Sequence, residues 1–84
     1  MTQDDDSTYT LEVFARLSGV DRETILHYQQ RGLVRPLPGS RGLFDDEALR
    51  TLRRIEHLRV ACGVNETGIR IILDLLQEVE RLRR

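Results

Sequence analysis

Apolar side chains recur every three or four residues in four segments of the chain, which is the spacing of one face of an α-helix. In the first segment, Leu11, Phe14 and Ala15 share such a face. Thr10 directly precedes them, where its hydroxyl can accept a hydrogen bond from the first helical turn. The pattern predicts a first helix that begins after Thr10 and ends at the tight turn of residues 18–20.

The second segment is shorter and more polar. Ile25 and Tyr28 lie three residues apart, Asp21 is placed to cap a helix, and Gly32 is placed to end it. A short extended piece at residues 33–34 is expected to follow. The stretch RPLPGSRGLF then holds two prolines and two glycines, which predicts a loop or small hairpin.

The third and fourth segments carry the clearest patterns. In the third, Asp45 or Asp46 is expected to cap a helix that Gly63 ends. Its apolar residues follow at every third position: Leu49, Leu52, Ile55 and Leu58. The fourth begins after Asn65 and is long for so small a chain, so we expect its distal part to pack on another copy or a partner.

These elements predict a mainly all-α fold in three parts. Residues 1–8 form an acidic tail that we expect to be disordered, because three aspartates follow one another there. Residues 9–63 form the folded unit, and residues 64–84 form the C-terminal helix. A chain of 84 residues can bury only a thin core, so a dimer interface would add useful stability.

The net charge and the local charge give opposite indications about nucleic-acid binding. The net charge of the whole chain is −1, whereas a non-specific nucleic-acid binder usually carries a basic excess. Between residues 16 and 59, however, there are nine arginines and six acidic residues, an excess of +3 that could neutralise a few phosphates.

The cysteine content, the apolar runs and the N-terminal residues indicate in which compartment the protein is expected. Cys62 is the only cysteine, which excludes an internal disulfide and suits a reducing compartment, and we expect it to be a small buried hydrophobe. No apolar run approaches membrane length, and the start MTQDDDST does not resemble a signal peptide. We therefore expect a cytoplasmic protein without a membrane partner.

Neither catalysis nor metal binding is expected. The sequence has no glycine-rich phosphate loop and no nucleophile with an ordered base. His57 and Cys62 lie five residues apart, roughly 140° around a helix, so they do not converge on a metal ion. The chain is expected to have no catalytic residues and no cofactor.

Two helices joined by a four-residue turn and followed by a looped wing are the pattern of a winged helix-turn-helix. The stretches LSGVDRETI, HYQQRGLVRP and FDDEALRTLRRIEHLR resemble the MerR family, over roughly residues 9–84. The resemblance implies a small wing and a long C-terminal helix for antiparallel dimerisation. The residues expected at the interface of a homodimer are Ile72, Leu75, Leu76, Val79 and Leu82.

The resemblance departs from the DNA-binding members of that family in the second helix. Those members typically carry Arg-Tyr-Tyr, where this chain has Leu26, His27 and Tyr28, and their wing carries Gly-Tyr-Arg, where the positive charge here has moved by one residue. Tyr28 also reads as a core residue with a polar tip. If double-stranded DNA is bound, the expected contacts are Arg22, Thr24, His27, Tyr28, Arg31 and Arg41.

Different stretches of the chain resemble two different branches of the family. FDD at residues 44–46 and LLQEVERLR at 75–83 look like the chaperone modulator CbpM, whose members bind the J-domain of the DnaJ-like co-chaperone CbpA and block its stimulation of the Hsp70 chaperone DnaK. GVNETGIRIILDL at 63–75 resembles HspR, a MerR-like repressor of heat-shock genes.

A CbpM-type modulator is the favoured interpretation, with a DNA-binding regulator as the alternative and a coiled-coil adaptor as a third class. An exposed leucine suits an apolar protein contact, and J-domains commonly present a basic helix, which suits acidic residues. The expected partner-binding residues are Leu26, Asp45, Asp46, Asp74 and Glu78. Each has a structural alternative: packing of the leucine against the wing, helix capping by the first two aspartates, and pairing of the other two acids with nearby arginines.

Overall fold

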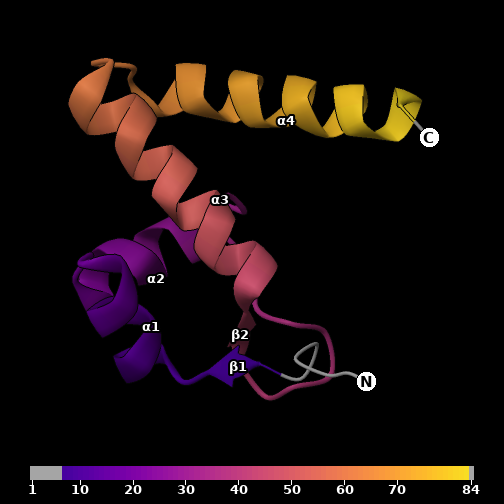
Figure 1. The fold of residues 1–84 in the computed structure, drawn as a ribbon. Helices are drawn as coiled ribbons and strands as arrows, with labels where there is room; N and C mark the ends of the chain where they lie inside the picture. Colours follow the sequence, from indigo (N-terminus) through magenta and orange to yellow (C-terminus); the bar gives the residue numbers. More distant parts are fainter. Residues whose placement is uncertain (1–6, 84) are drawn as a thin grey trace. The chain divides into compact units, whose positions relative to one another are not determined.

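The computed structural model describes residues 7–83, which form a mainly helical fold with one small sheet (Figure 1). The predicted fold class is confirmed. The helices are α1 (Leu11–Ser18), α2 (Arg22–Gln30), α3 (Asp46–Glu56), the π-helical turn η2 (His57–Ala61) and α4 (Glu66–Leu82); the strands are β1 (Thr8–Tyr9) and β2 (Phe44–Asp45). The chain divides into two compact units, one ending at Arg53 and one beginning at Arg54.

Side-chain caps start the first two helices where the sequence predicts them. Thr10 Oγ1 accepts a hydrogen bond from the Val13 N–H at 3.3 Å, and Asp21 Oδ1 accepts one from the Thr24 N–H at 3.0 Å. Gly19 ends α1 in the left-handed conformation, with φ at 74°, which a residue with a Cβ adopts only at a cost. The short turn between these helices is therefore determined by local sequence.

The end of α2 is a pair of hydrogen bonds closed around Gly32, whose φ is 76°. The Gly32 N–H donates to the Gln29 carbonyl at 3.0 Å, and the Leu33 N–H donates to the Tyr28 carbonyl at 2.9 Å, which is the Schellman arrangement. The reversal carries Leu33 and Val34 into the core as a bend. The prediction of an extended piece at this point is therefore wrong, because the helix end controls the path of the chain.

The loop between α2 and α3 closes on itself at its base. The Leu37 N–H donates to the Leu43 carbonyl at 2.7 Å, and Ser40 Oγ accepts from the Leu43 N–H at 3.0 Å. These bonds hold Arg41 at the far end with φ at 62°, a conformation that is uncommon outside glycine. The expectation of a loop or small hairpin is confirmed, and we refer to residues 37–43 as the wing.

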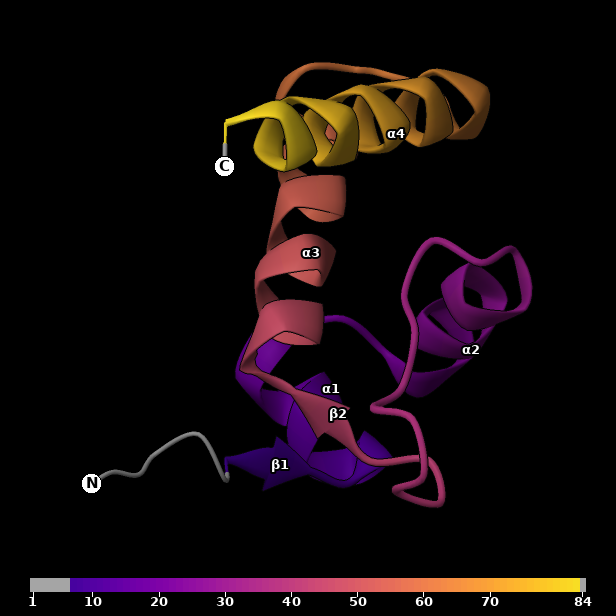
Figure 2. The ribbon, with the colours of Figure 1, turned by 90° about the vertical axis from the view of Figure 1, so that its right-hand side faces the viewer.

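The wing leads into a two-stranded sheet that the sequence did not predict. β1 pairs antiparallel with β2, with Thr8 opposite Asp45 and Tyr9 opposite Phe44 (Figure 2). Thr8 thus belongs to a strand and not to the predicted tail. Ser7 lies outside any helix or strand, and residues 1–6 of the predicted tail lie outside the described residues.

The core of the first unit is organised by two aromatic rings. Phe14 of α1 and Phe44 of β2 are stacked with ring centroids 4.3 Å apart and planes at 7°, and both are fully buried. The other buried apolar residues of this unit lie in α2, in α3 and in the turns on either side of α2: Val20, Ile25, Tyr28, Leu33, Val34, Ala48, Leu49 and Leu52. α1, α2, β2 and the start of α3 therefore share one core.

The third helical segment ends at Gly63 as predicted, but its last turn is wider than an α-helical turn. The Cys62 N–H donates to the His57 carbonyl at 3.3 Å, five residues earlier. In a regular α-helix Cys62 would lie about two turns beyond buried Ile55 and on the same face. The extra residue in the turn rotates Cys62 off that face, so the prediction that Cys62 is buried is wrong, and its thiol is exposed.

The second unit continues with α4, whose start is closely packed. Asn65 Oδ1 accepts from the Gly68 N–H at 2.9 Å, which confirms the predicted cap. A Cβ at Gly68 would lie 2.7 Å from Cγ1 of Val64, so a larger residue there would require the Val64 side chain to move. Ile69 is fully buried, Ile72 and Leu76 are half-buried, and the distal half of the helix is exposed. No helix among residues 7–83 is both long and apolar enough to span a membrane.

Replacing Phe14 with alanine should lower the free energy of unfolding by about 3–5 kcal/mol, because it removes buried apolar surface and leaves a cavity against Phe44. Urea unfolding followed by circular dichroism measures this loss. Leu17→Ala is the matched control on the same helix, since Leu17 is 46% exposed and should cost no more than about 0.5 kcal/mol. Equal losses in the two variants would show that the ring stack does not hold the unit together.

Candidate partner-binding surfaces

The outward face of α2 is set by the residues that the helix buries. Ile25 and Tyr28 point into the core, so the residues between and around them point outward. Leu26 is 41% exposed, and Arg22, one turn earlier on the same side, is exposed as well. The helix therefore presents a leucine beside a guanidinium, and the expectation of an exposed Leu26 is confirmed.

The residues predicted for DNA contact on α2 differ in how available they are. Tyr28 is buried, which confirms its alternative role as a core residue, and the exposed His27 ring lies 5.9 Å from the Tyr28 ring at a tilt of 54°. Thr24 is half-buried and its N–H is used by the helix cap. Arg31 is exposed at the C-terminal cap.

The cap at the start of α2 is a charged one. A hydrogen bond from the Thr24 side chain, followed by one from the Thr24 backbone, lowers the pKa of the Asp21 carboxyl below its usual range. Asp21 therefore remains ionised at neutral pH, where its charge also complements the positive end of the α2 dipole. The cap fixes where the helix starts and hence the direction in which Leu26 points.

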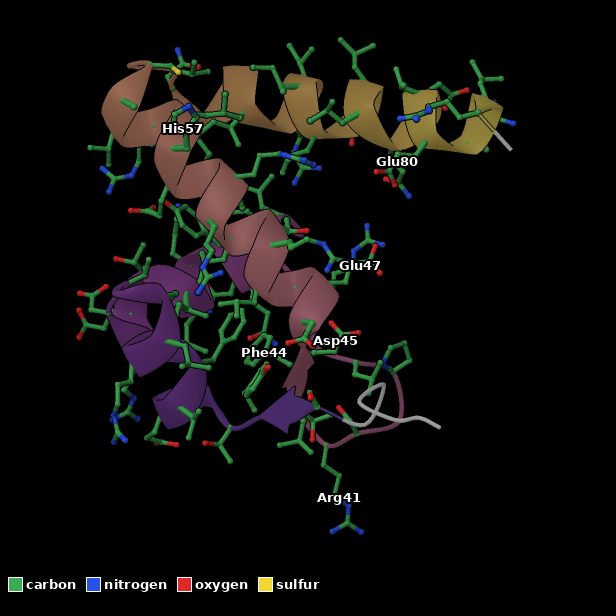
Figure 3. The ribbon with its side chains drawn as sticks, viewed as in Figure 1. Arg41, Phe44, Asp45, Glu47, His57 and Glu80 are labelled. Carbon is green, nitrogen blue, oxygen red and sulfur yellow. The ribbon has the colours of Figure 1, made fainter. Side chains whose placement is uncertain are left out.

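Two arginines are placed at the ends of the surface that a DNA reader would use. Arg22 Nη2 lies 3.8 Å from Glu12 Oε2, and both side chains are 61% exposed, so this ion pair is weak and does not neutralise the arginine. Arg41 is exposed at the wing and extends away from the ribbon (Figure 3).

The two aspartates before α3 are both used within the fold. Half-buried Asp45 accepts a hydrogen bond from the Ala48 N–H at 3.0 Å and is the cap of α3. Asp46 accepts a hydrogen bond from the Tyr9 hydroxyl, which raises the pKa of Tyr9. The capping alternative is thus confirmed for Asp45, and both carboxylates have a structural role before any partner is considered.

On α4 the candidate residues fall into an acidic and an apolar group. Glu78 forms an ion pair with Arg81, and Asp74 is exposed. Leu75, Val79 and Leu82 are exposed, whereas Ile72 and Leu76 are half-buried. Ile71 is a further exposed apolar residue that the prediction missed, although its place four residues before Leu75 could have identified it.

The structure therefore groups the candidates by unit. Leu26, Asp45 and Asp46 belong to the first unit, and Asp74 and Glu78 belong to the second.

In the part of the chain that the structure describes, no group of three or more His, Cys, Asp or Glu side chains is arranged to hold a metal ion.

Comparison with known proteins gives three relatives and one family. The family model described as MerR HTH family regulatory protein matches residues 9–76. The chain is 30% identical over 82 residues to the putative heat shock protein HspR of Streptomyces coelicolor, covering 95% of this chain and 54% of that protein. It is 32% identical over 79 residues to the chaperone modulatory protein CbpM of Citrobacter koseri, covering 92% of this chain and 78% of that protein.

A third relative matches a shorter part of the chain. The HTH-type transcriptional regulator MerD of Pseudomonas fluorescens is 45% identical over 49 residues, which cover 55% of this chain and 89% of that protein. By their names, the three relatives are transcriptional regulators, heat-shock proteins or chaperone modulators. The chain spans about half the length of HspR, 54% of it, so the activity of a whole relative does not transfer with the match.

Proposed function

The chain belongs to the MerR helix-turn-helix family, and we propose that within this family it is a chaperone modulator of the CbpM type. It would bind the J-domain of a CbpA/DnaJ-like co-chaperone and restrain the cooperation of that co-chaperone with DnaK. The observation that carries the proposal is the 41% exposure of Leu26 on the outward face of α2. The proposed role is not enzymatic, and it places the protein in the cytoplasm, with its partner.

Leu26 favours protein over DNA for a physical reason. A phosphate gains nothing from an aliphatic side chain, whereas covering the exposed part of Leu26, 41% of the residue, with an apolar partner surface is worth about 1 kcal/mol. Arg22, one turn before Leu26, would then lie at the exposed rim of this contact, where a charge contributes little to affinity. Leu26 is thus proposed as the apolar anchor of the partner interface.

The acidic residues would provide the electrostatic part of recognition. Asp74 on α4 is exposed and suits a basic helix of a J-domain. Glu78 shares its charge with Arg81, while Asp45 and Asp46 are held by hydrogen bonds. We propose that these three contribute mainly through their field, and that Leu26 and Asp74 contribute most directly.

A DNA-binding transcriptional regulator of the HspR type is the second candidate. The observation that favours it is the exposure of Arg22 at the start of α2 and of Arg41 at the wing. The first turn of a recognition helix and the end of a wing are the usual places for contacts to DNA. HspR also matches nearly the whole chain, 95% of it.

We also propose a homodimer, formed through the exposed side of α4. Leu75, Val79 and Leu82 lie on that side within two turns of one another and leave apolar surface uncovered. Ile72 and Leu76 are half-buried, and their exposed parts would join the same interface. A second copy of α4 would cover this surface with residues of the same kind.

Leu26→Asp should weaken binding of the J-domain protein by at least about tenfold, because a charge replaces the apolar anchor. Calorimetric titration of the full chain at low and high salt measures the affinity. Leu17→Asp is the matched control, an exposed leucine changed in the same way on α1. Equal affinity of the Leu26 variant and the unaltered chain would contradict the role of Leu26, and failure of the unaltered chain to bind would contradict the modulator proposal.

Arg22→Ala combined with Arg41→Ala should leave J-domain binding nearly unchanged if the modulator proposal is correct. If the DNA-binding alternative holds, the double variant should lose affinity for the promoter duplex, and the slope of log affinity against log salt should become shallower by about two. Fluorescence anisotropy with labelled duplex measures both quantities. Tight duplex binding that depends on these arginines, together with no J-domain binding, would favour the second candidate.

Val79→Asp should shift the protein from dimer to monomer, because the charge would be buried between two copies of α4. Sedimentation velocity across a range of concentrations measures the oligomeric state, and circular dichroism checks that the helices persist. Val60→Asp is the control, since Val60 lies in the same unit and is 68% exposed, against 50% for Val79. A dimer that survives Val79→Asp would exclude this face.

A further inference from the structure

An exposed ion pair joins the first two helices beside the surface proposed for partner binding. Arg22 Nη2 of α2 lies 3.8 Å from Glu12 Oε2 of α1, and both side chains are 61% exposed. The two helices are held in one core by buried residues such as Phe14 and Ile25, and an exposed ion pair adds little to that stability. The pair therefore acts mainly on what approaches the surface.

Arg22 belongs to the same outward line of α2 as Leu26. The two residues lie four positions apart, so their side chains are neighbours on the helix. Ile25 and Tyr28 fill the buried side of α2, which leaves this line outward. Glu12 approaches the N-terminal end of the line from α1, because its carboxylate lies beside Arg22. A carboxylate from a different helix thus lies at the edge of the Leu26 surface.

A DNA backbone at this surface would bring a phosphate close to Glu12. In a helix-turn-helix the first helix crosses the backbone, and the start of the second helix reaches the groove. A phosphate oxygen bonded to Arg22 Nη2 at about 2.8 Å would, with the 3.8 Å of the ion pair added, lie at most about 6.6 Å from Glu12 Oε2. This distance is shorter than the screening length of about 10 Å at roughly 0.1 M salt, so the two negative charges repel each other.

The same carboxylate does not oppose a protein partner. An apolar side chain that covers Leu26 carries no charge, and a basic residue at the rim of that contact would be attracted to Glu12. Because the rim remains hydrated, a charge there changes the choice of partner more than it changes the affinity for a suitable one. The charge of Glu12 therefore discriminates between a phosphate backbone and a protein surface.

Glu12 differs from the acidic residues that α2 itself provides. Asp21 caps α2, and hydrogen bonds from the Thr24 side chain and backbone lower its pKa, so its charge serves the fold. Glu23 lies in the first turn of α2, where a carboxylate complements the helix dipole. Glu12 has that relation to the dipole of α1, and its approach to Arg22 is additional. Mutation of Arg22 can therefore separate the two roles of Glu12.

We propose that Glu12 is a specificity-determining residue of the α2 surface. Its carboxylate beside Arg22 repels a phosphate backbone and leaves Leu26 to an apolar protein surface with neutral or basic residues around it. The inference rests on the proposed function for the identity of the favoured partner, which is a protein. The effect of Glu12 on DNA is a property of the Glu12–Arg22 pair and is measured separately.

The test compares the full chain with Glu12→Gln, which removes the charge and keeps the shape of the side chain. Fluorescence anisotropy follows binding of a labelled random-sequence duplex at low salt, because the phosphate contribution does not depend on sequence. The affinity should rise about threefold, the factor expected for two unit charges about 6.6 Å apart in water. Arg22 then binds a phosphate without competition, so the slope of log affinity against log salt should become steeper by up to about one.

Two controls separate this contact from the net charge of the chain. Glu47→Gln makes the same change in net charge at an exposed residue of α3 that points away from α1 and α2 (Figure 3), and it should raise the affinity less. In an Arg22→Ala background Glu12→Gln should lose most of its effect, because no guanidinium then holds a phosphate beside Glu12. Circular dichroism checks that the helices persist in each variant.

Unchanged duplex affinity in Glu12→Gln, including no detectable binding by either protein, would overturn the proposal. An equal rise in Glu47→Gln, or an undiminished rise in the Arg22→Ala background, would also overturn it, since either would indicate a general effect of charge.

Binding of the J-domain protein is measured separately by calorimetry. Its affinity should not rise in Glu12→Gln, and a rise equal to that for the duplex would show that Glu12 carries no specificity. Failure of the unaltered chain to bind the J-domain protein would contradict the proposed function, while the duplex measurement would still decide whether Glu12 repels a phosphate backbone.

Discussion

The rings of Phe14 and Phe44 lie 4.3 Å apart and almost parallel, and the first unit is built around this contact. Phe14 belongs to α1 and Phe44 to β2, thirty residues later, so the stack joins the start of the helix-turn-helix to the end of the wing. β2 runs directly into α3, whose first turn is capped by Asp45. One buried pair therefore holds α1, β2 and the start of α3 in a single core.

The same packing decides which side chains remain for a partner. Because Ile25 and Tyr28 must complete the core, the period of the helix places Leu26 outside. The backbone of α2 is fixed by its cap and by its end at Gly32. An arginine in place of Leu26 would therefore project from the same outward position and could bind a phosphate there. The difference between a DNA-binding surface and a protein-binding surface thus lies in a few outward residues and not in the fold.

Features determined within a few residues could be predicted from the sequence. The caps at Thr10, Asp21 and Asn65 each depend on one side chain and an N–H three residues later, and the sequence predicted all three correctly. The sheet was missed because Thr8 and Asp45 are far apart in the chain and two-residue strands leave no alternation to detect. The prediction for Cys62 was wrong because no residue of the sequence indicates the wide turn at the end of this helical segment. That turn rotates the side chains that follow it within the segment around the helix axis.

Charged candidates are harder to assign than apolar ones, because one carboxylate can serve the fold and a partner. Asp45 caps α3, and Asp46 accepts a hydrogen bond from the Tyr9 hydroxyl. Replacing either aspartate by alanine therefore disturbs the start of α3, whether or not the residue contacts a partner. Loss of binding in such a variant would not identify a contact. Leu26 has no such second role, since it is outside the core and its side chain has no polar atom. For this reason a loss of binding on substitution of the exposed Leu26 would identify a partner contact more directly than a loss at either aspartate.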